Sequence, residues 1–296
     1  MVGMKARSTL VPAEEWLREF IPYGTPCDEP CEDQSTAGKR RADAFEAELK
    51  TLGDRMARYQ RALYAERQRS LLVVFQAIDG GGKDGTIRKV FSGVNPQGVR
   101  VASFKKPTEL ERQHDFLWRI HQQTPAAGMI AVFNRSHYED VLVVRVDRIV
   151  PESTWRKRFD QINEFEAQLA AAGTTTLKFF LHISPEEQAQ RMRDRLRRPE
   201  KNWKFSRDDL EKRKQWYDYQ QAFQDMLQLC TTETAPWYVI PADRKWYRNT
   251  VIARAIVETL ETLDPQYPTA TEDFSDITIA DTIDGGSSDP GRQSRN

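Results

Sequence analysis

A glycine-rich segment with a single lysine carries the residue types in this chain that are most suited to chemistry. It reads DGGGKDGT from Asp79 to Thr86. Glycines allow several backbone N–H groups to turn toward one point, and a helix that begins behind such a loop adds the positive end of its dipole. The segment therefore predicts a phosphate-binding loop, made of Gly80, Gly81, Gly82, Lys83, Asp84, Gly85 and Thr86.

This loop departs from the common phosphate-loop pattern G-x-x-x-x-G-K-[ST]. Ala77 stands at the first glycine, and Asp84 stands at the Ser/Thr position. Asp79 would repel phosphate unless a cation intervenes, so it is interpreted as a metal ligand or as a group that orients the attacking oxygen. Two plainer interpretations stay open: a glycine-rich turn that binds nothing, and an Asp that only shapes the turn.

A second polar cluster, NRSHYED, follows another apolar run and spans residues 134–140. Arg135 can bind phosphate through two parallel hydrogen bonds. Glu139 and Asp140 could serve a metal or act as a base, or they could simply complement a helix dipole. His137 has no metal-ligand signature and is interpreted as structural or surface. Lys105, which follows an earlier apolar run, could contact an anion or stay solvated.

A third cluster is strongly basic and lies between residues 188 and 206. Arg191, Arg195 and Arg198 share one helix face by their spacing. Such a stripe resembles the mobile lid of nucleotide kinases, which closes over phosphate and excludes water. A solvated charged helix and a nucleic-acid surface with Trp203 as a stacking group are the alternatives. The basic residues are Arg191, Arg193, Arg195, Arg197, Arg198, Lys201 and Lys204.

Apolar patterns predict the elements that position these clusters. Strands alternate with helices, which is typical of a three-layer α/β/α domain with a mostly parallel five-stranded sheet, the phosphate-loop kinase fold, whose ligands sit at the carboxyl ends of the strands. Strands are expected at 71–75, 99–104, 129–133, 177–183 and 237–240. Helices are expected at 42–70, 87–91, 108–121, 155–172, 185–198, 208–229 and 245–263.

Composition divides the chain and limits its class. We expect an extended N-terminal arm over 1–40, a kinase domain over 41–264 with its lid at about 185–215, and a flexible C-terminal tail over 265–296. Lys+Arg and Asp+Glu are both 44, which disfavours a nucleic-acid-binding protein. No apolar run has the ~20 residues of a membrane span, and no secretory leader is evident.

Cysteine is scarce, which indicates a reducing, cytoplasmic compartment. Cys27 and Cys31 could be a metal or redox pair, but no second Cys/His pair follows at a zinc spacing, so that interpretation is not favoured.

Several segments, taken together and in this order, resemble the family-2 polyphosphate kinases. Gly82-Lys83 and Asn134-Arg135 lie in two of them, and the set spans most of the chain from 71 to 263. The segments are QAIDGGGKDG (76–85), FKKPT (104–108), HDFLWRIH (114–121), FNRSHYEDVLV (133–143), HISPEEQ (182–188), WKF (203–205), APWY (235–238) and PADRKWYR (241–248).

The resemblance implies direct, reversible transfer of a terminal phosphoryl group from inorganic polyphosphate to AMP or ADP, giving ATP, or to the guanine equivalents. It implies Mg²⁺, with Mn²⁺ as an alternative, and a homo-oligomer, either dimer or tetramer. It also implies that Asp79 assists metal binding or alignment of the nucleophile, so Asp79, Lys83 and Arg135 are expected to be catalytic. The implied phosphate-binding residues are Lys83, Arg135, Arg191, Arg195 and Lys204. From position alone, Glu139 is expected as a second metal ligand and Lys105 as a further phosphate contact. Asn134 is the residue type found at this position in the class III subgroup, which accepts both mono- and diphosphates.

Two other functions stay open from the sequence. One is an ATP-dependent kinase of nucleoside monophosphates or small metabolites on the same fold. The other is a non-catalytic module that binds phosphate or nucleic acid. Membrane and nucleic-acid partners are not expected.

Overall fold

The computed structural model describes residues 11–12, 36–273, 275 and 278–279. Most of the predicted N-terminal arm, the Cys27/Cys31 pair and much of the predicted tail therefore lie outside the described residues. In the described part of the chain, no helix is both long enough and apolar enough to cross a membrane.

A six-stranded sheet forms the centre of the described structure, in the order β1-β6-β5-β2-β4-β3. The five predicted strands are confirmed, and all of their neighbouring pairs run parallel. The edge strand β1 (Val11–Pro12), which pairs antiparallel with β6, was not predicted. The other strands are β2 (Ser70–Gln76), β3 (Val99–Ser103), β4 (Ile130–Asn134), β5 (Thr174–His182) and β6 (Trp237–Pro241).

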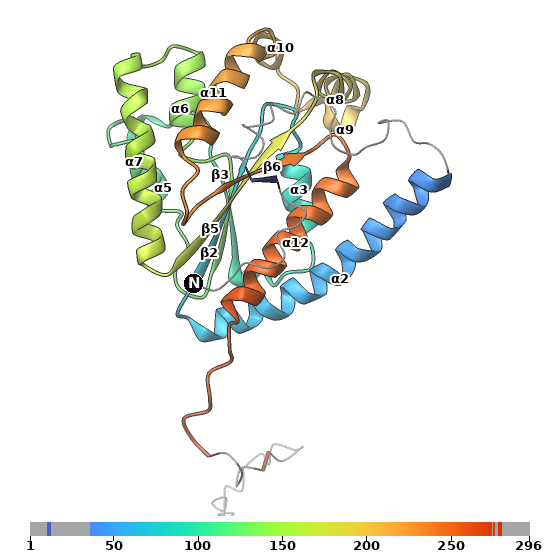
Figure 1. Ribbon diagram of the computed structural model, residues 1–296, viewed down its shortest axis with the longest axis vertical. Coiled ribbons are helices and arrows are strands. Elements are labelled where there is room, and N and C mark those ends of the chain that lie inside the picture. Colours follow the sequence, from blue (N-terminus) through green and yellow to red (C-terminus); the bar gives the residue numbers. More distant parts are fainter. Residues whose placement is uncertain (1–10, 13–35, 274, 276–277, 280–296) are drawn as a thin grey trace, which may run out of the picture.

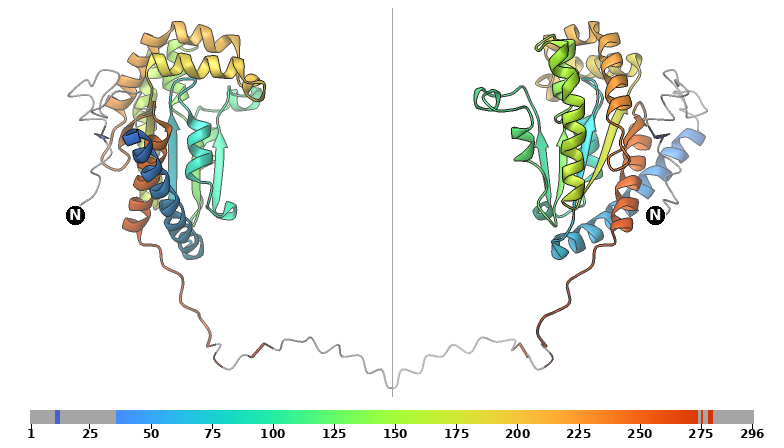
Figure 2. Two further views of the ribbon diagram at one scale, coloured as in Figure 1. Left: turned by 90° about the vertical axis from the view of Figure 1, so that its right-hand side faces the viewer. Right: turned by 60° about the vertical axis from the view of Figure 1, so that its left-hand side comes forward.

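Helices cover both faces of the sheet, as the three-layer prediction requires. α2 (Thr36–Glu66), α3 (Lys83–Val90) and α12 (Lys245–Leu263) lie on one face (Figure 1). On the other face lie α6 (Glu139–Val146), α7 (Glu152–Ala171) and α11 (Trp216–Leu229). Figure 2 shows α8 (Pro185–Arg197) and α10 (Arg207–Lys214) lying across the ends of the strands. The remaining helices of the described structure are α4 (Glu109–Arg112), α5 (Trp118–His121) and α9 (Pro199–Asn202).

Two predicted helices are interrupted, and the predicted first helix is displaced. The helix predicted at 108–121 is split into α4 and α5, because the Asp115 carboxylate accepts the Leu117 N–H and offers the backbone a turn instead. The helix predicted at 208–229 breaks at Gln215. There the chain passes from α10, which buries no residue, to α11, which buries Trp216. α2 begins before residue 42 and ends at Glu66, where Arg67 is left-handed (φ 53°).

A buried ion pair lies between the sheet and α7. Lys178 on β5 and Glu166 on α7 are almost fully buried, and Lys178 Nζ lies 2.5 Å from Glu166 Oε2. The Tyr138 hydroxyl donates to Glu166 Oε1 at 2.8 Å, and His137 Nε2 lies 3.1 Å from the same oxygen. Burial lowers the pKa of His137, so this histidine is a neutral core residue. The cluster therefore anchors the segment that immediately follows Arg135.

Candidate active site

The predicted phosphate loop connects β2 to α3 at the carboxyl edge of the sheet. Gly80 and Gly82 have φ of 88° and 97°, a region that glycine enters without steric cost. A Cβ on Gly81 would overlap Ala77, so the chain cannot accept a larger residue there without moving. Gly82 caps α3, and Gly85 and Thr86 lie in the helix, with the Thr86 hydroxyl donating to the Gly82 carbonyl at 3.1 Å. The loop therefore has the backbone shape of an anion nest.

Lys83 is buried beneath this loop. Its ammonium donates to the Ala77 carbonyl at 2.8 Å. Burial, together with the charge of Arg135, lowers the pKa of Lys83 to about 8, against the opposing attraction of Asp79. The neighbouring carboxylates therefore do not fully offset the cost of burying the Lys83 ammonium beside Arg135.

Arg135 lies at the centre of a charged network on the β4 side of the loop. Its backbone is left-handed (φ 61°), and its N–H donates to the Phe75 carbonyl at 3.1 Å, which ties the turn after β4 to the end of β2. Arg135 Nη2 lies 2.6 Å from Asp79 Oδ1, and Nη1 lies 3.2 Å from Glu139 Oε2. The structure therefore brings together the three predicted catalytic residues and the predicted metal ligand Glu139.

Asp79 is surrounded by positive charge. Besides Arg135, Lys212 on α10 places Nζ 3.7 Å from Asp79 Oδ2. Burial alone would raise the pKa of Asp79, but the charges of Arg135, Lys83 and Lys212 outweigh it and hold that pKa below its usual value. Asp79 is therefore a carboxylate at neutral pH, suited to orienting cations rather than to donating a proton.

The basic helices that were predicted to form a lid do contact the loop. The Gln188 amide donates to the Asp79 carbonyl at 2.7 Å. Arg191 Nη1 donates to the carbonyls of Gly80 and Gly81 at 3.1 and 2.9 Å, while its Nη2 reaches the Ala242 carbonyl after β6. Arg191 thus links the loop, α8 and the β6–α12 connection.

Asp84 joins the lid to β4. Its Oδ1 accepts from the Asn134 amide at 2.8 Å, and its Oδ2 lies 2.9 Å from Lys204 Nζ. The residue that replaces the usual Ser/Thr of a phosphate loop therefore connects β4 to the segment that was predicted to form a lid. In a protein with Ser or Thr at this position, the same contact to a lysine would be much weaker.

The remaining predicted residues lie further from the loop. Arg195 Nη1 lies 3.3 Å from Asp209 Oδ2 at the start of α10, so in this structure it braces the lid. The Lys105 side chain is exposed, and its carbonyl accepts from Arg119 at 2.8 Å. Sequence reasoning missed Lys212, Gln188 and Arg248. A signal was present for Gln188 and Arg248, which end the segments HISPEEQ and PADRKWYR, but not for Lys212.

Comparison with known proteins gives the family. The family model described as Polyphosphate kinase 2 (PPK2) matches residues 39–268, which is more than half of the chain. The chain belongs to the polyphosphate kinase 2 family. The resemblance seen in the sequence segments is thereby confirmed.

Relatives named as polyphosphate phosphotransferases align over most of the chain. An AMP/ADP-polyphosphate phosphotransferase of Meiothermus ruber is 56% identical over 240 residues, covering 81% of this chain and 89% of the relative. An ADP-polyphosphate phosphotransferase of Rhodopseudomonas palustris is 46% identical over 235 residues, covering 75% and 81%. The crystal structure of polyphosphate kinase 2 from Arthrobacter aurescens TC1 matches with a TM-score of 0.77 at 38% identity, covering 90% of this chain and 94% of that one.

Few side chains in the described part of this polyphosphate kinase 2 family member could bind a metal ion. Within residues 36–273, no group of three or more His, Cys, Asp or Glu side chains is arranged to hold an ion. Asp79 and Glu139 nevertheless flank the same guanidinium. Mg²⁺ in phosphoryl-transfer sites is commonly held by one or two carboxylates, substrate phosphates and water. The carboxylate pair fits that mode of binding.

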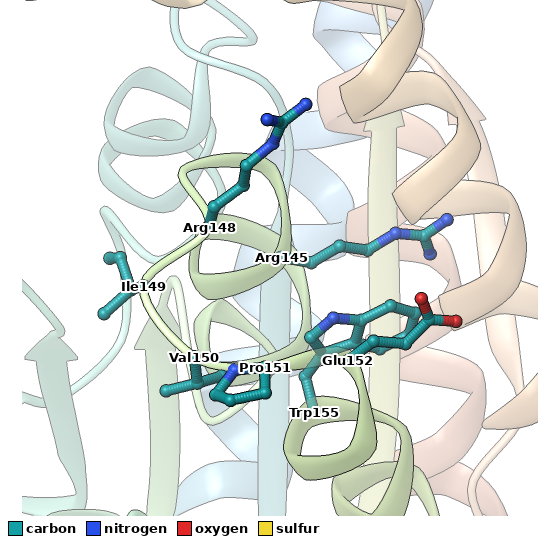
Figure 3. Close-up of a pocket in the computed structure, with 7 residues that line it drawn as sticks. All are labelled: Arg145, Arg148, Ile149, Val150, Pro151, Glu152 and Trp155. Atoms are coloured by element: carbon teal, nitrogen blue, oxygen red, sulfur yellow. The ribbon is translucent and has the colours of Figure 1, made fainter.

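A separate hollow of about 530 Å³ lies at the turn between α6 and α7 (Figure 3). The guanidinium of Arg145 lies 4.6 Å from the centre of the Trp155 ring, and it also pairs with Asp225 at 2.6 Å. The charge of Arg145 is therefore already satisfied by protein groups. None of the residues that line this hollow belongs to the phosphate loop or the lid, so the reaction is not placed there.

Proposed function

We propose that this chain transfers a terminal phosphoryl group from inorganic polyphosphate to AMP and to ADP, forming ADP and ATP. The observation that carries the proposal is the convergence of Lys83, Arg135 and Arg191 on one glycine loop. The 56% identity to a relative named AMP/ADP-polyphosphate phosphotransferase supports the choice of donor and acceptors. Asn134, hydrogen-bonded to Asp84, is the residue type that the class III subgroup carries at this position.

The proposed reaction is an in-line displacement. A terminal oxygen of the acceptor attacks the last phosphorus of polyphosphate, the bond from that phosphorus to its bridging oxygen breaks, and the donor leaves one phosphate shorter. No covalent intermediate on the protein is needed, since phosphoryl transfer depends on positioning and charge neutralisation. We therefore assign no nucleophilic side chain.

Each cation has a place in this scheme. Lys83 and the loop N–H groups hold the transferring phosphoryl, and Arg135 lies between it and the acceptor phosphate. Asp79 orients Arg135, and Lys212 joins Asp79 from the lid. Mg²⁺, held by Asp79 and Glu139 when bound, would neutralise charge on the phosphates. Gln188 and Arg191 hold the lid on the loop, which excludes water during transfer.

We further propose that residues 41–264 form the kinase domain and that α8 to α10, within residues 185–215, act as its lid. The contacts of Lys204 with Asp84 and of Lys212 with Asp79 support this assignment, because each joins a lid residue to the phosphate loop. Both contacts would break if the lid opened.

An ATP-formation assay tests the proposal. The purified chain is incubated with AMP or ADP and Mg²⁺, with and without long-chain polyphosphate, and ADP and ATP are separated by chromatography. We expect product only with polyphosphate and Mg²⁺, and none with Lys83→Ala. Conversion of AMP that requires ATP and is indifferent to polyphosphate would instead identify an ATP-dependent kinase. Absence of any transfer would overturn the proposal.

A further inference from the structure

Arg248, in the first turn of α12, is a buried arginine without a carboxylate partner among the described ion pairs. Its side chain is 3% exposed. Nε and Nη2 both donate to the neutral Asn249 Oδ1, at 3.1 and 3.0 Å, whereas Nη1 is buried and has no hydrogen-bond partner in the described structure. A buried donor left without a partner is costly, and more so when it is charged.

The free Nη1 points at the phosphate loop. A Cβ added to Gly82 would overlap Arg248 Nη1 and would lie 3.0 Å from Arg191 Nη1. Two guanidinium groups therefore stand beside the residue that caps α3, where the dipole of that helix adds further positive potential. A side chain larger than hydrogen would therefore not fit at Gly82. The Arg248 Nη1 group, a hydrogen-bond donor without a partner in the described structure, lies directly beside the phosphate loop.

Arg191, Arg248 and Lys245 form a basic corner beside the loop, and Glu187 offsets only part of its charge. Glu187 lies close enough to affect both arginines, but its Oε1 already accepts from Arg191 Nε at 2.6 Å. Burial, followed by the charge of Arg191, lowers the pKa of Arg248 to about 9, which still leaves the guanidinium charged at neutral pH. Burial lowers the pKa of nearby Lys245 as well, and Arg191 and Arg248 add to that effect. The corner is thus a concentration of positive charge that an anion would stabilise.

The corner lies on a different flank of the loop from Arg135. Arg248 and Lys245 come from α12, which follows β6, whereas Arg135 follows β4, and the loop after β2 lies between them in the sheet order β6-β5-β2-β4. Under the proposed function, Lys83 and the loop N–H groups hold the transferring end of the donor, and Arg135 lies between it and the acceptor. An anion at Arg248 is therefore a different phosphate of the same substrate.

We infer that Arg248 and Arg191 form a donor subsite that binds an internal phosphate of the polyphosphate chain, and that Arg248 is a specificity-determining residue for polyphosphate. This inference rests on the proposed function. A nucleotide donor carries a neutral sugar beyond its phosphates, whereas polyphosphate continues as an anion. A cationic corner at this flank therefore favours polyphosphate over a nucleoside triphosphate as donor.

Replacement by an uncharged side chain of similar length, Arg248→Met, tests the subsite. We expect the KM for polyphosphate to rise roughly 10- to 100-fold, which is the value of a charge-assisted hydrogen bond to phosphate. The KM for ADP should stay within about twofold, since the proposed function places the acceptor on the Arg135 side of the loop. Arg248→Lys keeps the charge but loses the planar fork, and it should recover part of the affinity.

Thermal melting gives a readout that separates ligand binding from a structural role. Since Arg248→Met removes a desolvated charge, the ligand-free variant should melt no lower than wild type. Sodium tripolyphosphate, added without nucleotide, should raise the melting temperature of wild type and have little effect on the variant. Arg254→Met is the matched control on the same helix, because Arg254 pairs with Glu48 at 2.7 Å. It should lower the melting temperature but keep the tripolyphosphate response.

The outcomes distinguish this inference from the proposed function. If wild type neither responds to tripolyphosphate nor uses polyphosphate, the proposed function fails. If wild type does both and Arg248→Met retains the wild-type KM for polyphosphate and the wild-type thermal response, the subsite alone is refuted. Should Arg248→Met fail to fold, Arg248→Lys decides: an unchanged KM for polyphosphate would refute the subsite, and a raised KM with an unchanged KM for ADP would support it.

Discussion

Removing the charge of Glu166 should strongly destabilise this protein. In Glu166→Gln, the side chain keeps its shape, but an amide N–H₂ or a neutral oxygen replaces the carboxylate that lies 2.5 Å from Lys178 Nζ. Lys178 is fully buried, and its other hydrogen bonds go to the Tyr138 hydroxyl and the Cys230 carbonyl, both neutral. The variant therefore leaves an ammonium in the core without a counter-ion.

Breaking a buried pair from one side typically costs about 3–5 kcal/mol in free energy of unfolding. For a domain of this size that corresponds to a fall of roughly 6–20 °C in melting temperature. Differential scanning calorimetry measures the effect directly. The exposed pair Arg156–Glu152, whose side chains are 57% and 63% exposed, provides a matched control. Glu152→Gln should change stability by about 0–1 kcal/mol.

A double-mutant cycle shows whether the loss comes from the uncompensated charge. Lys178→Met combined with Glu166→Gln removes both charges and keeps the volume of the core, so the double variant should recover most of the stability lost in Glu166→Gln. If the effects of the two single changes simply add, the two side chains are not coupled. A melting temperature of Glu166→Gln that equals that of the Glu152→Gln control would refute the reasoning as well.

Three further predictions concern the site. Asp79→Asn should lower kcat by roughly 100-fold or more, because Arg135 and Lys212 lose the carboxylate that orients them. Steady-state kinetics near wild type would contradict this role. The value of kcat/KM for polyphosphate should fall as the pH rises through about 8, since the pKa of Lys83 is lowered to about 8 and only its protonated form attracts phosphate. In Lys83→Arg this fall in kcat/KM should occur at higher pH. A wild-type kcat/KM that stays constant over the same pH range would contradict the role of Lys83 in binding phosphate. Gly82→Ala should destabilise the chain by about 1–2 kcal/mol, because the φ of Gly82 is 97°. It should also weaken polyphosphate binding, because the new methyl group would displace Arg248. Gly53→Ala is the control: its methyl group meets open space within a helix, so it should not destabilise the protein.

The fold was accessible from the sequence wherever burial produced a simple pattern. The run from Leu71 to Phe75 is entirely buried, as a strand between two parallel neighbours must be, so continuous apolar residues identified it. α6 was missed, because its sequence is rich in Val, which is stiff in helices, and only packing against α7 and α11 makes this segment helical. β1 was missed because a two-residue edge strand has no periodicity to detect.

The site divides in a similar way. Asp79 and Arg135 lie in the turns that follow β2 and β4, and Lys83 is the first residue of the helix after β2, so their convergence follows from parallel topology. Lys212 and Arg248 stand on helices far along the chain, and nothing in local spacing indicates that they face the same loop. Lys105, by contrast, was predicted to contact phosphate but lies away from the loop. It also follows a strand, β3, but that strand lies at the edge of the sheet, two places from β2, and the lysine is exposed.

The packing of α2 against α12 has a consequence for how the molecule is made. Arg254 on α12 pairs with Glu48 on α2 across a separation of 206 residues, and the Thr250 hydroxyl reaches the Phe45 carbonyl across 205. During synthesis on the ribosome, α2 emerges long before the helix that covers it, and such long-range contacts slow folding. Arg248 enters the phosphate loop only when α12 docks. The nascent chain therefore exposes the apolar face of α2 for most of its translation, and it acquires the donor side of its site at the last step of folding.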